Sequence, residues 1–270
     1  MLKGFIINKS QLMESLVGLI EERARHLEDL LGVPVRPSIN PGALPRSCTS
    51  DLAKYIDHTN LNLDARPADI DKLCDEAVRF GFTAVCVNGC YARQITKKLA
   101  GSEVKTCCVI GFPLGCMTTA AKISETRELV QLGVQEIDMV INCGWLKAGM
   151  YKEVYGDIKA VASVCHYGSK PATLKVILEC TCLETDDLII DSSLLSLAAG
   201  ADFIKTSTGM HKAGGAKAEH VRIMRLVAGD KMKVKAAGGI RSAEAAQEMV
   251  CSGADRIGAS ASVAICGGQV

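Results

Sequence analysis

The 270-residue chain carries 31 basic and 30 acidic side chains, a formal net charge of +1, which argues against a nucleic-acid surface or a patch for anionic membranes. Its hydrophobic fraction is high at 48%, yet no apolar run approaches the roughly 18 residues of a membrane-spanning helix. Charged side chains interrupt residues 1–22, where a secretory signal would need an apolar stretch, so we expect a cytoplasmic protein with no nucleic-acid or membrane partner.

The first fifty residues differ in pattern from the rest of the chain. Residues 11–31 have the apolar spacing of an amphipathic helix, and the segment VPVRP (33–37), followed by Pro41 and Pro45, is typical of an extended connector. We therefore divide the chain into an N-terminal helical extension with its connector, residues 1–50, and a main unit, residues 51–270.

Residues 51–270 alternate short apolar runs with amphipathic segments. The predicted strands are 53–58, 84–88, 105–111, 136–142, 174–179, 202–206, 233–236 and 255–258, and the predicted helices include 68–80, 119–132, 146–166, 187–199, 218–227 and 243–251. Strands that alternate with helices run parallel, and eight such units close a barrel of about 250 residues. The predicted fold is α/β, a (β/α)8 TIM barrel whose extra N-terminal helix covers the closed end of the barrel or packs on a partner subunit.

Glycines support these boundaries. Gly133, Gly200 and Gly253 each follow a predicted helix and precede a predicted strand. We expect them to adopt the left-handed conformation that ends many helices.

The 13 cysteines do not indicate a metal or disulfide protein. Their number is odd, and most lie inside apolar runs, where free cysteine behaves as a small hydrophobic residue. The spacing of Cys86 and Cys90, and that of Cys180 and Cys182, does not fit the usual zinc pairs, and the five histidines form no ligand cluster. We expect reduced thiols, no metal site and no cofactor.

Four consecutive strands carry a charge where a barrel strand is ordinarily apolar. These charges are Asp138, Lys175, Lys205 and Lys235. An unpaired charge in a barrel interior is costly, so we interpret the four as one coupled polar site at the mouth rather than as separate structural pairs. A second ammonium group beside a lysine disfavours its positive charge and so favours its neutral amine. A neutral amine attacks carbonyl groups, so the pattern predicts a Schiff-base enzyme.

Two glycine loops add a second prediction. The segment GGIRS (238–242) follows the seventh strand, and GAS (258–260) follows the eighth. Barrels often bind phosphate at these two loops, through backbone N–H groups and a helix N-terminus. We expect a phosphate site there, although a glycine pair alone is usually only a turn.

Several segments together resemble the deoxyribose-phosphate aldolase family. The resemblance is carried by IDHT (56–59), EIDMVIN (136–142), KVILE (175–179), DFIKTSTG (202–209) and KAAGGIR (235–241). The segment around Lys205 is highly specific, whereas the glycine loops occur in many phosphate-binding barrels. The resemblance runs from about Tyr55 to Ser260, and residues 1–50 carry no such signature.

The resemblance implies a class I aldolase that reversibly cleaves 2-deoxy-D-ribose 5-phosphate to acetaldehyde and D-glyceraldehyde 3-phosphate. Lys205 matches the Schiff-base lysine of the family, and Lys235 matches the second lysine, which keeps the nucleophile unprotonated. Asp138 matches the residue that shuttles protons through a water molecule, and Lys175 matches a lysine near the substrate hydroxyls. The family also implies a homodimer and a role in deoxyribonucleoside catabolism.

The resemblance extends to the residues that hold the substrate. It implies sugar contacts at Asp57, Thr59, Cys86 and Thr208, and phosphate contacts at Gly209, Gly238, Gly239, Arg241, Gly258 and Ser260.

Three departures from the family pattern predict slower turnover than is typical. Met210 follows Gly209 where some members have a phosphate-contacting lysine, for which Lys212 or Arg241 is expected to compensate. Ala261 stands where a second serine is common, and the sequence has no terminal tyrosine.

Three alternatives stay open at this point. Another class I aldolase or a transaldolase would share the lysine, and a substrate assay would separate them. A metal-dependent aldolase is disfavoured by the missing histidine cluster. A noncatalytic phosphosugar-binding protein would bind the ligand without turnover.

Overall fold

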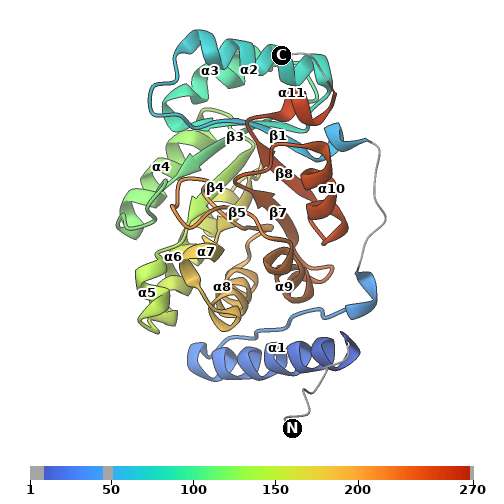
Figure 1. Ribbon diagram of the computed structural model, residues 1–270. Helices are drawn as coiled ribbons and strands as arrows, with labels where there is room; N and C mark the ends of the chain where they lie inside the picture. Colours follow the sequence, from blue (N-terminus) through green and yellow to red (C-terminus); the bar gives the residue numbers. More distant parts are fainter. Residues whose placement is uncertain (1–8, 45–50, 268–270) are drawn as a thin grey trace.

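Eight parallel strands pair in sequence order and close on themselves, with β8 hydrogen-bonded to β1 (Figure 1). The computed structural model describes residues 9–44 and 51–267. Helices surround the barrel and one further helix lies N-terminal to it, so the predicted (β/α)8 fold with a helical extension is confirmed.

The strands lie close to their predicted positions. They are β1 (Ile56–Asn60), β2 (Ala84–Asn88), β3 (Lys105–Ile110), β4 (Glu136–Val140), β5 (Thr173–Ile177), β6 (Phe203–Lys205), β7 (Lys233–Ala237) and β8 (Arg256–Ala259). The bounds of β2 are those predicted. β1 begins at Ile56 rather than Ala53, because residues Leu52–Tyr55 form a 3-10 turn.

The helices include several that the sequence pattern did not predict. They are α1 (Lys9–Leu31), α2 (Pro67–Phe80), α3 (Ala92–Lys98), α4 (Thr119–Gln131), α5 (Cys143–Lys147), α6 (Tyr151–Cys165), α7 (Cys180–Leu183), α8 (Asp186–Ala199), α9 (Ala218–Ala228), α10 (Ala243–Cys251) and α11 (Ser262–Ile265). Helices α3, α7 and α11 were missed because they have only 7, 4 and 4 residues, too few for a helical period to stand out.

The predicted helix 146–166 is wrong as a single element. It is two helices, α5 and α6, separated by a turn at Gly149 with φ 72°. The predicted left-handed glycines are confirmed, since Gly133, Gly200 and Gly253 have φ 87°, 89° and 113°.

The barrel has an apolar outer face and a charged interior. Side chains alternate along a strand, so Ile137 and Met139 of β4 pack outward in the main hydrophobic core while Asp138 faces the interior. The strand register then aligns Asp138 with Lys175, and Lys205 with Lys235. Lys175 pairs with Phe203, so Lys205 and Lys235 lie two residues further along their strands than Asp138 and Lys175. The four side chains still meet around the Asp138 carboxylate.

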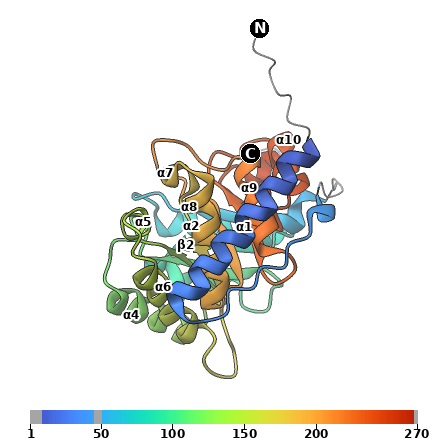
Figure 2. The same ribbon diagram turned by 90° about the horizontal axis from the view of Figure 1, so that it is seen from below.

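Helix α1 lies across the outer surfaces of α6 and α8 (Figure 2). Its inward face buries Ile20, Ala24 and Leu27, and the Arg23 guanidinium donates from Nε to Asp191 Oδ1 at 2.7 Å. All residues of α8 from 189 to 196 are buried, and a helix buried on all sides needs a cover on its outer face as well. Of the two predicted positions of α1, cover of the closed end of the barrel is therefore wrong, and packing on a partner subunit stays a prediction.

A buried ion pair joins α4 and α6 to the end of β4. Lys122 is fully buried and places Nζ 2.6 Å from Asp157 Oδ2 and 2.9 Å from the Val140 carbonyl oxygen. Thr119 donates from Oγ1 to the other oxygen of Asp157 at 2.8 Å. These bonds hold the strand that carries Asp138 against its two flanking helices.

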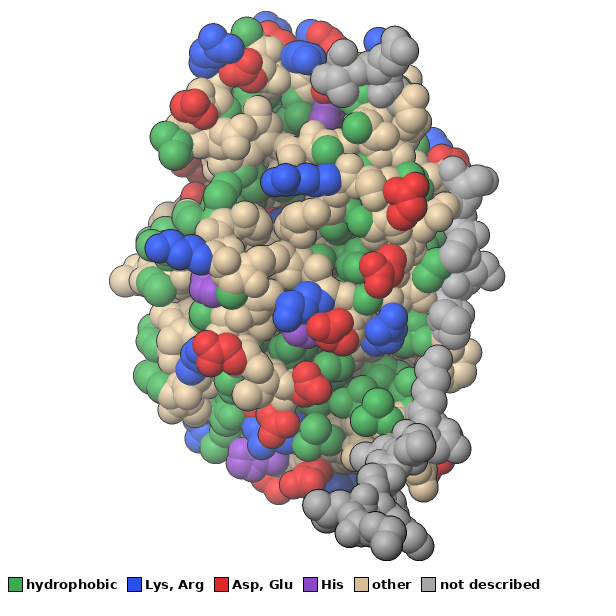
Figure 3. All heavy atoms as spheres, in the orientation of Figure 1, with side chains coloured by type: hydrophobic (Ala, Val, Ile, Leu, Met, Phe, Trp, Pro, Cys, Tyr) green, Lys and Arg blue, Asp and Glu red, His purple; other side chains and the backbone are tan. Residues whose placement is uncertain are grey.

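The surface and the cysteines agree largely with the sequence-based expectations. On the face shown in Figure 3, acidic and basic side chains are interspersed rather than gathered by sign. Within the described ranges, no helix combines the length and the apolar character needed to span a bilayer.

Eleven cysteines of the described residues are free, but Cys251 is disulfide-bonded, so the expectation of reduced thiols is wrong for that residue.

Substitution Asp157→Asn tests the buried pair. Loss of the carboxylate leaves the Lys122 ammonium buried without its counter-charge, so we expect the free energy of unfolding to fall by about 3 kcal/mol. Urea unfolding followed by circular dichroism measures this change. Glu153→Gln, at an exposed position of the same helix, is the control and should change stability by less than about 0.5 kcal/mol. Equal stability of the two variants would contradict the structural role of the pair.

Candidate active site

A cavity of about 980 Å³ opens at the carboxyl ends of the barrel strands. The loops after β1, β6, β7 and β8 supply much of its lining. Of the residues predicted for the site, it is lined by Thr59, Lys205, Thr208, Gly209, Gly238, Gly239, Arg241, Gly258 and Ser260. The mouth of the barrel is where enzymes of this fold place their chemistry, so this cavity is the candidate substrate site.

Lys205 connects this cavity to the barrel interior. It is the last residue of β6, its residue exposure is 2%, and it lines the cavity. Its Nζ atom donates to Asp138 Oδ2 at 2.9 Å. Asp138, Lys175 and Lys235 are fully buried and do not line the cavity. Among the four predicted charges, Lys205 is therefore the one placed to meet a substrate.

Asp138 accepts hydrogen bonds from all three lysines. Besides Lys205, Lys235 donates to Oδ2 at 2.9 Å, and Lys175 donates to Oδ1 at 2.8 Å. Burial alone would raise the pKa of this carboxyl, but the three ammonium groups outweigh it and hold the pKa well below its ordinary value. Asp138 is therefore a carboxylate. The predicted cluster of the four charges is confirmed, but its predicted place at the mouth is right only for Lys205, since the other three do not line the cavity.

Lys235 and Lys175 are anchored by more than one carboxylate. Lys235 Nζ lies 2.5 Å from Asp57 Oδ2, and Lys175 Nζ lies 2.6 Å from Glu136 Oε2. Burial lowers the pKa of both lysines, but the carboxylates reverse this effect and raise both pKa values above the ordinary range. Both side chains therefore keep their positive charge, and Lys205 Nζ and Lys235 Nζ, which share one oxygen at 2.9 Å, are fixed close together.

Glu136 and Arg256 complete this network, and sequence reasoning assigned no role to either residue. Arg256 Nη1 lies 2.6 Å from Asp57 Oδ1 and 3.3 Å from Glu136 Oε2. We call the seven residues joined by these ion pairs the interior charge cluster: Asp57, Glu136, Asp138, Lys175, Lys205, Lys235 and Arg256. Glu136 and Arg256 lie inside the predicted strands 136–142 and 255–258, but neither was singled out there.

Two residues predicted to contact the sugar lie elsewhere. Asp57 is fully buried and does not line the cavity, and its carboxylate is held by Lys235 and Arg256, which keep its pKa below the ordinary value despite burial. Cys86 is also fully buried and outside the lining. These positions place both residues in or beside the interior charge cluster rather than on the cavity wall.

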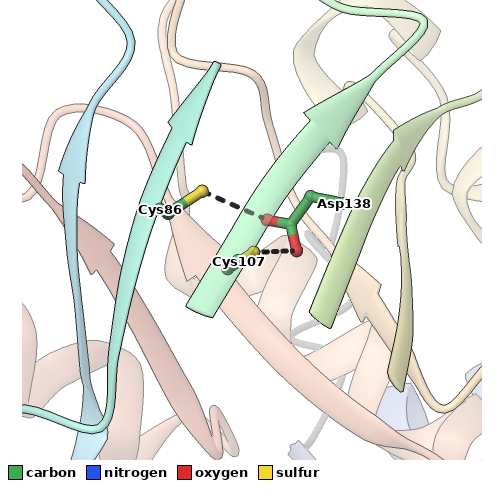
Figure 4. A group of neighbouring side chains, drawn as sticks. All are labelled: Cys86, Cys107 and Asp138. Atoms are coloured by element: carbon green, nitrogen blue, oxygen red, sulfur yellow. Dashed lines mark hydrogen bonds between the residues drawn. The ribbon is translucent and has the colours of Figure 1, made fainter. Parts of the chain in front are cut away.

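Cys86 and Cys107 approach Asp138 from β2 and β3 (Figure 4). Their sulfur atoms lie 4.0 and 3.2 Å from the Asp138 carboxylate oxygens. Three such ligand atoms resemble a metal site in spacing. However, the same carboxylate is surrounded by three ammonium groups, and burial raises the pKa of Cys107 well above its ordinary value, so the thiol keeps its proton. This environment disfavours a cation.

Glu179 is a second residue that sequence reasoning left without a role. It follows β5 in the left-handed conformation with φ 54°, and its side chain is buried. Its Oε2 atom accepts hydrogen bonds from the Thr208 backbone N–H at 3.2 Å and from the Thr208 hydroxyl. The carboxylate thus fixes Thr208, which lines the cavity and lies three residues after Lys205 in the chain.

The predicted phosphate loops meet at one end of the cavity. Gly238 has φ 91°, and its carbonyl accepts from the Ala216 N–H at 3.0 Å. A Cβ atom at Gly238 would lie 2.9 Å from Gly215 Cα, so only glycine permits this approach. Arg241 and Met210 both line the cavity, whereas Lys212 does not. Of the two side chains expected to compensate for Met210, Arg241 is therefore the one in place.

Comparisons with known proteins agree with this geometry. A family model described as DeoC/LacD family aldolase matches residues 52–268. Proteins named deoxyribose-phosphate aldolase from Mannheimia succiniciproducens and Clostridium perfringens are both 49% identical to the chain, and the alignments cover 80% and 81% of it and 93% and 96% of the relatives.

Solved structures give the same result. A putative deoxyribose-phosphate aldolase from Coccidioides immitis superposes with a TM-score of 0.79 and 40% identity, covering 94% of this chain and 96% of that one. The deoxyribose phosphate aldolase from Aeropyrum pernix, described as a unique tetramer, gives a TM-score of 0.75 and 34% identity over 81% of this chain and 91% of that one. The chain belongs to the DeoC/LacD family of aldolases.

Proposed function

We propose that this protein is a class I aldolase that reversibly cleaves 2-deoxy-D-ribose 5-phosphate to acetaldehyde and D-glyceraldehyde 3-phosphate. The observation that carries the proposal is the position of Lys205, which reaches the cavity while its amine shares an Asp138 oxygen with the charged Lys235. The relatives named deoxyribose-phosphate aldolase support the choice of substrate.

The arrangement supports Lys205 as the nucleophile. Lys175 and Lys235 each face at least two carboxylates, whereas the ion pairs of Lys205 in the described residues involve Asp138 alone. Lys205 is therefore the least anchored of the three lysines, and it alone of the three lines the cavity. Its neutral amine attacks the C1 aldehyde carbon of the open-chain sugar, and loss of water leaves a protonated imine.

The imine makes carbon–carbon cleavage feasible. A base removes the proton of the C3 hydroxyl, the C2–C3 bond breaks, and its electron pair passes into the imine to form an enamine. The C3 fragment leaves as glyceraldehyde 3-phosphate. Protonation of the enamine at C2 and hydrolysis then release acetaldehyde and free the amine. Asp138, an ionised carboxylate next to Lys205, is the proposed acid and base, acting through a water molecule.

The phosphate group has a positioning role in this proposal. Gly209, Gly238, Gly239, Arg241 and Ser260 all line the cavity, and α10 begins at Ala243, just after Arg241. Backbone N–H groups, a helix N-terminus and a guanidinium favour an anion. Because the phosphate is remote from the C2–C3 bond, its binding energy orients the reacting carbons.

Borohydride trapping tests the nucleophile. Incubation with acetaldehyde and borohydride should leave a reduced adduct on Lys205 that peptide mass spectrometry locates, and Lys205→Leu should abolish both the adduct and turnover. Lys97→Leu, at an exposed lysine of α3, is the control and should behave as wild type. Normal turnover in Lys205→Leu would rule out the mechanism, and ligand binding without turnover in the wild-type protein would indicate a noncatalytic phosphosugar-binding protein.

Substitution Lys235→Leu tests the neighbouring charge. Without this ammonium group, Lys205 keeps its proton to a higher pH, so we expect kcat to fall at least about 100-fold at pH 7 and to recover partly as the pH is raised. A coupled assay of glyceraldehyde 3-phosphate release between pH 6 and 10 measures both effects. Lys235→Arg, which keeps the charge, should lose less activity at pH 7. A rate loss that is independent of pH would contradict this role.

Substitution Gly238→Ala tests the phosphate loop. The added methyl group collides with Gly215, so we expect the KM for 2-deoxyribose 5-phosphate to rise about tenfold or more while cleavage of unphosphorylated 2-deoxyribose changes little. Gly156→Ala, where a Cβ meets open space on α6, is the control. Equal losses on both substrates would show that the substitution damages the catalytic centre instead.

Four expectations remain predictions of this proposal. They are a homodimer, a cytoplasmic location, a role in deoxyribonucleoside catabolism, and the division into an extension of residues 1–50 and a catalytic unit of residues 51–270. Light scattering on the purified protein would decide the first, since one relative is described as a tetramer.

A further inference from the structure

Glu136 and Arg256 lie at the opposite end of the barrel from the substrate cavity. They are the first residues of β4 and β8, whereas Lys205 is the last residue of β6. Neither lines the substrate cavity. Glu136 instead lines a second cavity of about 560 Å³ among the starts of β3, β4 and β5. The guanidinium of Arg256 packs over the Phe203 ring at 5.5 Å.

Two routes of ion pairs run from Arg256 to the nucleophile. One passes through Asp57 and Lys235 to Asp138, with contacts of 2.6, 2.5 and 2.9 Å. The other passes through Glu136 and Lys175 to Asp138, with contacts of 3.3, 2.6 and 2.8 Å. Both routes end at the carboxylate that accepts a hydrogen bond from Lys205.

The charges of the cluster balance only when one lysine is neutral. The cluster holds four basic side chains, at 175, 205, 235 and 256, and three carboxylates, at 57, 136 and 138. Asp57, Asp138, Lys175 and Lys235 are fully buried, so an uncompensated charge among them is poorly solvated. Loss of one proton from Lys205 brings the sum to zero.

We infer that Arg256 and Glu136 are positioning residues that set, from the closed end of the barrel, the pH at which Lys205 becomes a nucleophile. They act with opposite signs, because one adds a positive and the other a negative charge to the same cluster. This inference rests on the proposed role of Lys205.

Other titratable groups also face Lys205 or its cavity. Within the barrel these are Asp57, Cys86, Cys107, Asp138, Lys175 and Lys235, from the six strands β1, β2, β3, β4, β5 and β7. At the mouth, the cavity is lined by His58, Asp64, Arg66, Asp69, Lys72, Glu76 and Arg241. Most of the mouth groups are open to solvent and salt screens them, whereas the buried interior contacts are screened far less. Substitutions at Arg256 and Glu136, which test the inference, leave every one of these groups in place.

The two variants should move the pH dependence in opposite directions. Arg256→Gln removes a positive charge, so protonated Lys205 becomes easier to tolerate and the acid limb of the kcat/KM profile should move to higher pH. Glu136→Gln removes a negative charge, so the limb should move to lower pH. We expect shifts of about one pH unit, and the double variant should return the limb close to its wild-type position.

The experiment measures kcat/KM for 2-deoxyribose 5-phosphate and the rate of borohydride trapping with acetaldehyde between pH 5 and 9. The charge-conserving variants Arg256→Lys and Glu136→Asp are the controls, and their limbs should stay within about 0.3 pH units of wild type. Circular dichroism melting shows which variants fold. If Arg256→Gln does not fold, the sign of the shift in Glu136→Gln and the unmoved limb in Arg256→Lys still test the inference.

The outcomes separate this inference from the proposed function. A wild-type protein without an adduct on Lys205 would remove the proposed function and the inference with it. A wild-type adduct on Lys205, with limbs that do not move or that move in the same direction in the folded Gln variants, would overturn the inference alone. Opposite shifts of the acid limb in the two single variants, with a limb near its wild-type position in the double variant, would support the inference. A mere loss of packing would lower the rates but would not move the limb in opposite directions.

Discussion

The site depends on one buried carboxylate shared by three ammonium groups. Asp138 is fully buried on β4, and it is tolerable in the interior because Lys175, Lys205 and Lys235 surround it. Each lysine in turn requires the carboxylate. None of the four has a simple apolar substitute, because removal of one leaves the others uncompensated in a medium that solvates charge poorly.

The barrel supplies the precision that this interaction needs. Four neighbouring strands direct Asp138, Lys175, Lys205 and Lys235 toward one point of the interior, and closure of β8 on β1 carries Arg256 to the same interior. The buried bonds of Lys122 fix the end of β4 from outside. Lys205 is thus held on a rigid strand, while the cavity that it lines is bordered by loops whose glycines allow close approach.

Sequence reasoning was most successful where a residue breaks a strong local rule. Charged side chains at Asp138, Lys205 and Lys235 violate the apolar character of buried strands, so they stood out and were assigned correctly to one cluster. Arg256 lies near the start of its predicted strand, where a charge is ordinary, and so it gave no signal. Glu179 was seen but not interpreted, because its contact with Thr208 depends on a left-handed backbone conformation.

The sequence by itself determined the order of strands and helices, the eight-unit barrel and the residue types of the site, because periodicity and turn chemistry are local properties. Only the tertiary structure decided that α1 lies on α6 and α8, that Asp57 serves the charge cluster rather than the cavity wall, and that Glu136 and Arg256 close the network. These facts depend on which side chains from distant segments meet, and a buried charge takes its partners from the fold as a whole.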